Sequence, residues 1–296
     1  MGALGVSLQE AVQAFALHLT RRPLRENTRK AFLGDVRLFV RFLGQDALGR
    51  PVATLRAEHI RNFLQHEERR RVANSPKSLE RRLTSLKVFF KWLNEAGYIP
   101  SNPAEGVPYR PVVEPLPEYL SDAELEAVIA AAEAFAAQAR HDTRPLAAIL
   151  LVAETGIKKS ECLKLEVSDV DLGEGIVHVR YVEPSLKFKE RSLPISRRCV
   201  RAVEAHLERF KPHKRLFECT GRNIEYLFNR RIAPAAGLRA LTFEMLRWTC
   251  AVREYRAGEQ DDEIMQHKYG LSPIGWSEMA AKLARILAAE QAQRHP

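Results

Sequence analysis

The chain has 296 residues, 46% of them hydrophobic and 28% charged, which favours two globular domains and argues against a largely disordered protein. Of its net charge of +9, most lies in residues 1–115, where 19 lysines and arginines face 11 acidic residues, a balance that favours a nucleic-acid partner. There is no apolar run long enough for a membrane span, no secretory signal pattern in the first 20 residues and no CxxC motif, so we expect a cytoplasmic protein without a metal ion.

In the first third of the chain, apolar residues recur at the spacing of amphipathic helices. This spacing predicts helices over residues 7–21, 27–43, 56–70 and 76–97. Ser7 and Glu10 form a capping-box pattern at the first helix, and Gly97 is a C-cap signal at the end of the fourth. We expect a four-helix domain over residues 1–110. Its candidate DNA contacts, on the second and fourth helices, are Arg29, Lys30, Lys77, Arg81, Arg82 and Lys87.

A proline-rich segment separates this domain from the rest. Residues 101–118 hold five prolines and no helical period, so we place a linker at residues 111–118 and a second domain at residues 119–296. Alternation predicts two paired strands over residues 175–182 and 186–195. Helices are predicted from Ser121 onward and over residues 144–155, 197–210, 222–232, 242–257 and 276–291. The fold class is therefore mainly α, with a small β-sheet in the second domain.

Three ordered motifs in the second domain carry a resemblance. They are TGIKKSE at residues 155–161, SLKFKERSLP at residues 185–194 and TFEMLRWTCA at residues 242–251, and NPA at residues 102–104 ends the first domain. Together they resemble the tyrosine recombinase family (phage integrase, Xer-type). The resemblance covers nearly the whole chain. It implies an N-terminal SAM-like core-binding domain and a C-terminal domain of the recombinase catalytic type.

The family's chemistry gives each motif position a role. A tyrosine attacks a DNA phosphodiester, two arginines clamp the phosphoryl oxygens, and a lysine and a histidine assist proton transfer, with no metal or other cofactor. In this sequence the first arginine is replaced by Lys158 and the histidine by Glu244, whereas the second arginine is present as Arg247. The hairpin lysine matches Lys187, with Lys189 as the alternative. The resemblance adds Lys158, Lys187 and Arg247 to the expected DNA contacts.

The nucleophile segment aligns in three registers, and none of them supplies a tyrosine. The paired positions of the family's histidine and tyrosine fall on Leu271 and Ala280, on Gly270 and Met279, or on His267 and Trp276. No tyrosine occurs after Tyr269, which is the runner-up as a relocated nucleophile. Tyr255 is a weaker substitute.

These observations predict a pseudoenzyme, a DNA-binding protein of the recombinase family that does not cleave DNA. The alternative is an active site-specific recombinase that uses a relocated or partner-supplied tyrosine. A third interpretation, a protein-binding helical module, conflicts with the basic first domain. Expected partners are double-stranded DNA and either further copies of the chain or an active recombinase, with no membrane. The amphipathic segment 276–291 is a candidate for exchange between protomers.

Overall fold

The computed structural model describes residues 5–70, 75–109, 115–138, 142–258 and 261–294. The chain divides into two compact units, Met1–Pro115 and Leu116–Pro296, which are described separately. Residues 111–114 of the predicted linker lie outside the described residues. Among the described helices, none combines the length and the apolar character that crossing a bilayer requires.

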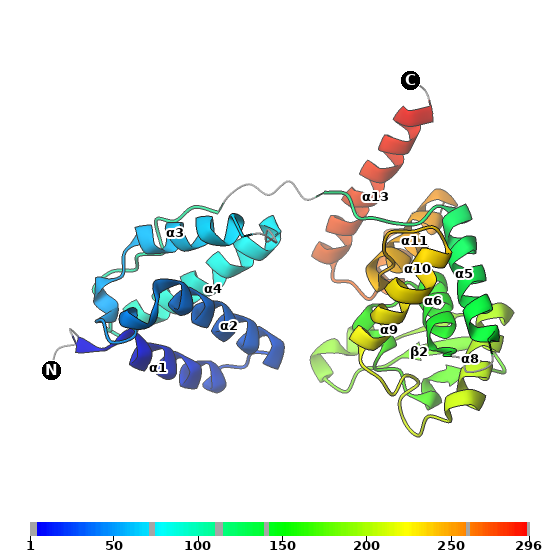
Figure 1. The fold of residues 1–296 in the computed structure, drawn as a ribbon, viewed down its shortest axis with the longest axis horizontal. Helices are drawn as coiled ribbons and strands as arrows, with labels where there is room; N and C mark the ends of the chain where they lie inside the picture. Colours follow the sequence, from blue (N-terminus) through cyan, green and yellow to red (C-terminus); the bar gives the residue numbers. More distant parts are fainter. Residues whose placement is uncertain (1–4, 71–74, 110–114, 139–141, 259–260, 295–296) are drawn as a thin grey trace. The chain divides into compact units, whose positions relative to one another are not determined.

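The first unit is built from four helices, as the apolar spacing predicts (Figure 1). They are α1 (Leu8–Arg21), α2 (Glu26–Leu43), α3 (Ala57–Glu68) and α4 (Pro76–Glu95), with two short 3-10 turns, η2 (Gln45–Ala47) and η3 (Val52–Thr54). The capping box between Ser7 and Glu10 is present at α1. Gly97 takes a left-handed φ of 74° directly after α4 and its C-cap, which confirms the predicted helix end.

Aromatic side chains fill the core of this unit. The Phe15 ring meets the Phe89 ring edge-on at 5.0 Å between centroids, and Phe39 meets Phe63 in the same way at 5.4 Å. All four phenylalanines are fully buried. These contacts join α1 to α4 and α2 to α3, and the Phe39 and Phe90 rings, 6.1 Å apart, link the two pairs.

The second unit surrounds one central helix. Helices α5 (Asp122–Ala137), α8 (Arg197–Phe210) and α11 (Phe243–Arg256) pack against α6 (Arg144–Thr155), and strand β2 (Ile176–Val179) belongs to the same unit (Figure 1). Consecutive residues from Ala147 to Ala153 on α6 are all buried, and a helix that is buried on every side lies at the centre of its unit. The shorter helices are α7 (Lys159–Cys162), α9 (Gly221–Leu227), α10 (Ala233–Ala235) and α12 (Asp262–Lys268), joined by the turns η4 (Val167–Asp169) and η6 (Phe228–Ile232).

The sheet has three antiparallel strands in the order β1–β2–β3. Strand β1 is Val170–Asp171, and β3 is Arg191–Pro194. In the register, Val177 pairs with Leu193 and Val179 pairs with Arg191. Val177, Val179 and Leu193 are buried, so one face of this small sheet packs on the core, and the same register places the Arg191 side chain on that buried side.

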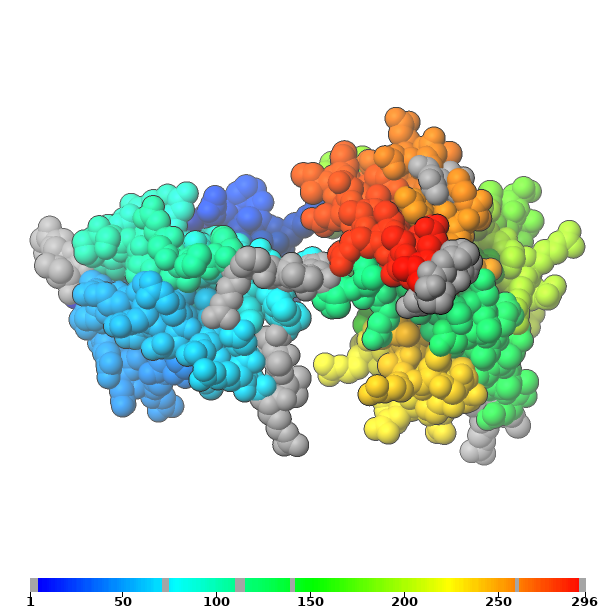
Figure 2. Space-filling view, turned by 90° about the horizontal axis from the view of Figure 1, so that it is seen from above, coloured from blue at the N-terminus to red at the C-terminus, as the bar shows by residue number. Residues whose placement is uncertain are grey.

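The last helix, α13 (Pro273–Arg294), packs against its own unit. Trp276, Met279, Leu283 and Ile286 are buried in a cluster with α11 and α12 residues. Glu290, a turn further on, accepts a hydrogen bond from Arg256. In Figure 2 the orange and red atoms of α13 form part of the surface of this unit. In this structure, then, the segment considered for exchange has a place on its own protomer.

Three sequence predictions differ from the structure. Residues 186–190 are not a strand: Pro184–Lys189 form the 3-10 helix η5, and none of its side chains is buried, so no core face selects a strand there. The predicted helix 222–232 contains a π-helical turn at Phe228–Ile232 and continues into α10. Helix α12 was not predicted, because its seven residues are too few to show a clear apolar period.

Candidate functional site

The site begins where α6 ends, in the TGIKKSE motif. Gly156 terminates α6 in the left-handed conformation with φ 63°. A Cβ at this position would lie 2.3 Å from Cε1 of Tyr269, so the glycine is required by both its backbone conformation and its neighbour. The tight turn directs Lys158 and the short helix α7 toward the segment that joins α12 to α13, which here is residues 269–272.

Glu161 on α7 is the centre of a buried polar network. Its carboxylate forms a bidentate ion pair with Arg191, whose Nη2 lies 2.7 Å from Oε2 and whose Nη1 lies 3.2 Å from Oε1. It also accepts bonds from the Tyr181 hydroxyl at 2.5 Å and from the Lys158 backbone N–H at 2.8 Å. Burial favours the neutral acid, but Arg191 and these donors hold the pKa of Glu161 below its ordinary value.

Three cationic side chains donate to three consecutive backbone carbonyls. Arg191 Nε bonds to the Lys268 oxygen at 2.6 Å, Arg247 Nη2 to the Tyr269 oxygen at 3.0 Å, and Lys158 Nζ to the Gly270 oxygen at 3.0 Å. These donors come from β3, from α11 and from the residue before α7. We call the three acceptor carbonyls, those of Lys268, Tyr269 and Gly270, the carbonyl strap. It gives the cations of the site uncharged oxygen partners within the protein.

Burial governs the charge state of the cations. The pKa of Lys158 is lowered to about 8, mainly by burial and also by the neighbouring Arg247, Lys189 and Arg191 charges, whereas Glu161 opposes the shift. Burial likewise lowers the pKa of Arg247, whose Nη1 also donates to the Gly156 carbonyl. The arginine remains charged, as guanidinium groups do in proteins. Lys158, Arg191 and Arg247 therefore concentrate positive charge beside the three carbonyls of the strap.

The Glu244 carboxylate is bonded within its own helix. Its Oε1 accepts a bond from Trp248 Nε1 at 2.9 Å, one turn along α11. All three residues concerned are described, and no ion pair joins Glu244 to Lys158 or Arg247 within 4.0 Å. The carboxylate nevertheless acts on the Arg247 charge through space, since it raises the pKa of that guanidinium against the effect of burial.

The structure places the nucleophile candidates in the interior. The Tyr269 side chain is fully buried; its hydroxyl donates to Glu254 Oε2 at 2.8 Å and lies 3.2 Å from the Cys250 sulfur. Burial and these acidic neighbours raise the pKa of Tyr269 well above its ordinary value. Trp276 and Met279 are buried on α13, and Ala280 is half-buried beside them. Tyr255 is half-buried against the same cluster.

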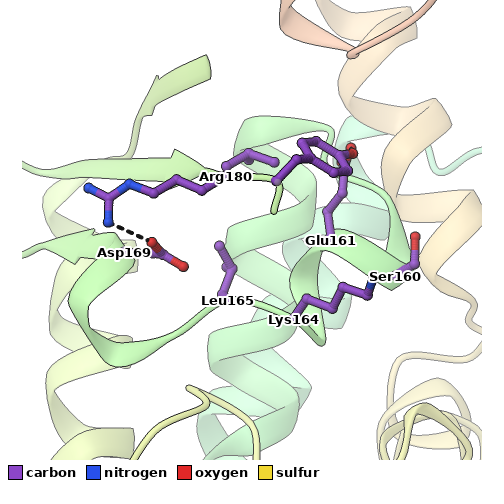
Figure 3. Close-up of a pocket in the computed structure, with 8 residues that line it drawn as sticks. Ser160, Glu161, Lys164, Leu165, Asp169 and Arg180 are labelled. Carbon is purple, nitrogen blue, oxygen red and sulfur yellow. Dashed lines mark hydrogen bonds and ion pairs between the residues drawn. The ribbon is translucent and has the colours of Figure 1, made fainter. Parts of the chain in front are cut away.

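The β2–β3 connector, residues 180–190, carries Lys187 at the edge of the site. Lys187 is exposed and pairs with Glu190 at 2.7 Å. Beside the connector a small pocket opens against α7 (Figure 3). There Arg180 extends to Asp169 at 3.1 Å. The pocket is lined by Ser160, Glu161, Lys164, Leu165, Asp169, Val179, Arg180 and Tyr181.

Of the six candidate DNA contacts in the first unit, one lies inside the protein. The Arg82 side chain is 10% exposed and pairs with Glu67 at 2.5 Å, so it is a core ion pair and we remove it from the DNA contacts. Arg81 is half-exposed and pairs with Asp35 at 2.5 Å. The other four reach the surface to different extents: Arg29 and Lys87 are half-buried, and Lys30 and Lys77 are exposed.

Sequence reasoning missed the residues that organise the site. Arg191 stands inside the SLKFKERSLP motif, and a charged residue inside a buried strand was the available signal for its ion pair. The carbonyl strap had no signal, because any residue supplies a backbone oxygen. No group of three or more His, Cys, Asp and Glu side chains suited to a metal ion occurs among the described residues.

Comparison with known proteins identifies relatives over both units. Residues 118–270 match the Phage integrase family, and residues 12–97 match the Phage integrase, N-terminal SAM-like domain. The tyrosine recombinase XerC of Roseiflexus sp. (strain RS-1) is 25% identical over 304 residues, which covers 98% of this chain and 94% of that protein. The match to XerC of Oceanobacillus iheyensis, 25% identical over 201 residues, covers 68% of this chain but only 62% of that protein. For XerC of Xylella fastidiosa (strain M23), 31% identical over 169 residues, these shares are 56% and 54%.

Solved structures show the same fold at low sequence identity. A lambda integrase dimer bound to a COC′ core site gives a TM-score of 0.72 at 17% identity, covering 93% of this chain and 77% of that one. The Tn1549 transposon integrase in complex with transposon right end DNA gives 0.71 at 18% identity, covering 98% and 99%.

Proposed function

Because the chain belongs to the phage integrase family, we propose that it binds duplex DNA in a recombination or integration system without cleaving it. The observation that carries this proposal is the position of Tyr269. It is the last tyrosine in the sequence, and its hydroxyl is bonded to Glu254 in the interior. The Tyr269 hydroxyl is therefore engaged in the interior, and residues 270–294, which follow it in the described part of the chain, contain no tyrosine that could take its place.

The expected loss of cleavage has a physical basis in distance and charge. An attacking oxygen must approach phosphorus to about 3–3.5 Å in line with the leaving oxygen. Trp276, Met279 and Ala280, the three candidate positions, carry no group that can attack, and the first two are buried. Glu244 adds a negative charge where the reaction builds up more of it.

DNA binding is supported by charge and by the relatives. The first unit holds most of the net charge of +9, and relatives of this fold are solved as integrases bound to DNA, some as dimers or tetramers. We assign the DNA contacts to Arg29, Lys30, Lys77, Arg81 and Lys87 in the first unit, with Lys158, Lys187 and Arg247 in the second. Arg247 and Lys158 would have to exchange the carbonyl strap for phosphate oxygens, whereas Lys187 is already exposed.

The alternative remains an active recombinase whose tyrosine comes from a partner. A relocated Tyr269 would first have to leave its buried site and break its bond to Glu254. A partner-supplied tyrosine needs no such rearrangement. It does need Lys158 to serve in place of an arginine, although an ammonium lacks the planar fork that holds a phosphate bidentately.

Two measurements test the proposal together. Binding to a duplex should weaken steeply with salt, with a slope of about −0.9 per phosphate neutralised. Incubation with nicked suicide duplexes should give no denaturation-resistant protein–DNA band. A band that persists in Tyr255→Phe but vanishes in Tyr269→Phe would identify a relocated nucleophile and overturn the proposal. A band that contains the partner's tyrosine and forms only when both an active recombinase and this chain are present would favour the alternative.

Assembly on DNA is tested separately with α13. Because this helix packs on its own unit, removing residues 276–296 would expose the buried faces of α11 and α12. A shorter truncation after residue 287 keeps Trp276, Met279, Leu283 and Ile286 in place. If the helix end joins protomers, this truncation should abolish cooperative binding to paired sites and leave single-site binding intact. Unchanged cooperativity would count against an exchange of the helix end.

A further inference from the structure

The β2–β3 connector exposes apolar side chains next to the cationic site. Phe188 is 62% exposed and Val182 is 94% exposed, and both lie on this one segment. Isolated exposed apolar residues are common on protein surfaces. Here, however, Phe188 stands between Lys187 and Lys189 in the sequence, and the Lys189 ammonium lies 5.3 Å from the ring centroid.

The connector is held in shape by its own hydrogen bonds. Glu190 Oε1 accepts the backbone N–H of Tyr181 at 2.7 Å and the ammonium of Lys187 at 2.7 Å, which closes the base of the connector. Between these residues η5 makes 3-10 bonds, including Leu186 N–H to the Glu183 oxygen at 2.9 Å. The ring of Phe188 is therefore presented by a formed structure, which lowers the entropy lost when it contacts a ligand.

The same segment is bonded to the candidate phosphate site. Arg191 Nη1 donates to the Lys189 carbonyl at 2.9 Å while its Nε donates to the carbonyl strap. Lys189 is also close enough to Lys158 to influence its protonation. A DNA strand whose phosphate lies against Lys158 and Arg247 would thus place its neighbouring nucleotides, about 3.4 Å apart along the axis, beside the connector.

From this arrangement we infer that Phe188 is a wedge that inserts between adjacent base pairs of bound duplex DNA, while Lys187 and Lys189 contact the flanking phosphates. The inference rests on the proposed function, since it concerns how the bound DNA is deformed. Apolar side chains that enter from the minor groove unstack a base step and kink the duplex. Steps that unstack easily, and mismatched pairs, are bound more tightly by such a wedge because less stacking is lost.

The experiment compares two 30-base-pair duplexes that differ at one central position. One is fully paired and the other carries a central mismatch, and both carry 2-aminopurine as the base adjacent to that position. We expect the wild-type protein to bind the mismatched duplex about tenfold more tightly, a ratio within what the cost of unstacking one base step allows. Binding should also raise the 2-aminopurine fluorescence, which increases when that base unstacks.

Matched variants separate a wedge from a general surface contact. Phe188→Ala should bring the affinity ratio close to one and abolish the fluorescence change, with the salt slope of binding unchanged because no charge is lost. Phe188→Leu should keep most of both signals. The control is Tyr226→Ala, which removes a ring that is 59% exposed and lies 6.0 Å from a cation, Arg230, but is on α9.

The outcomes distinguish the inference from the proposed function. If wild type and Phe188→Ala show the same ratio of affinities for the mismatched and the paired duplex, and both still bind in a salt-dependent way, the wedge is overturned and the proposed function stands. Loss of the ratio in Tyr226→Ala as well would also overturn it, because the effect would not be specific to the connector. Absence of binding to either duplex at low salt would contradict the proposed function itself.

Discussion

The buried ion pair between Glu161 and Arg191 allows the most quantitative test of how the second unit is stabilised. The two side chains are 3% and 0% exposed, and Arg191 makes four hydrogen bonds, two to Glu161 and one each to the carbonyls of Lys189 and Lys268. Replacing Arg191 by Met keeps much of the volume but leaves the carboxylate without its counter-charge. Breaking one partner of a buried pair costs about 3–5 kcal/mol.

The assay is urea unfolding followed by the fluorescence of Trp248 and Trp276 in a Trp92→Phe background. With a urea slope of about 2 kcal/mol/M, a loss of about 4 kcal/mol moves the midpoint down by about 2 M. The double variant Arg191→Met/Glu161→Gln should recover part of this loss, because a neutral amide can still bond to Tyr181 and to the Lys158 N–H.

The pH dependence of the Arg191→Met variant has a defined sign. In wild type the pKa of Glu161 is held low, so its stabilising contribution is present above the unfolded pKa and is lost only as pH falls through the folded value. Without Arg191, burial dominates and raises the pKa of Glu161, so protonation stabilises the folded state. The deficit of the variant should therefore shrink between pH 7 and pH 5.

The control is Arg180→Met. In wild type Arg180 pairs with Asp169, but its side chain is 58% exposed, so losing this pair should cost less than about 1 kcal/mol. A midpoint shift in Arg191→Met no larger than that in Arg180→Met would refute the assignment of this pair as the main polar support of the site. A deficit that grows toward pH 5 would refute the pKa argument.

Three further predictions follow from backbone geometry, burial and charge. Gly156→Ala should cost about 3 kcal/mol in urea unfolding, from its left-handed backbone and its contact with a buried ring, whereas Gly237→Ala, with φ 73° and open space, should cost about 1 kcal/mol. Since burial lowers the pKa of Lys158, its charged form disfavours folding, and the unfolding free energy of wild type relative to Lys158→Met should rise as pH increases from 7 to 9.5. Arg82→Met should destabilise the first unit by about 1–3 kcal/mol, because Glu67 loses its 2.5 Å pair and keeps the longer one with the half-exposed Arg70 at 3.4 Å. The salt slope of DNA binding measured by fluorescence anisotropy should stay unchanged, and a reduced slope would return Arg82 to the DNA contacts.

The helical parts of the fold were predictable because their apolar periods are long. Four helices of 12 to 20 residues in the first unit each bury one stripe, and Ser7 and Gly97 mark the ends of the set. The β2–β3 connector was not predictable in this way. Residues 186–190 alternate like a strand in sequence, but no buried surface lies against them, so local bonding produced a 3-10 helix instead.

The chemistry of the site was predictable only where side chains carry it. Lys158, Glu244 and Arg247 could be located from motifs, and the absence of a tyrosine after Tyr269 could be read directly from the sequence. Burial could not. Arg82 lies in a run of basic residues on a surface-like helix, and only the packing of α3 on α4 shows that it faces Glu67 rather than solvent.

The backbone at Gly270 decides whether a histidine can occupy this position. In the register that counts without gaps from Arg247, this residue stands where the family has its histidine. Its φ of 55° is unfavourable for any side chain with a Cβ, and that Cβ would lie 2.7 Å from Arg191 Nη1. A histidine introduced alone would therefore strain the loop and push against the Arg191–Glu161 pair. A histidine at this position therefore requires the loop and the ion pair to change first.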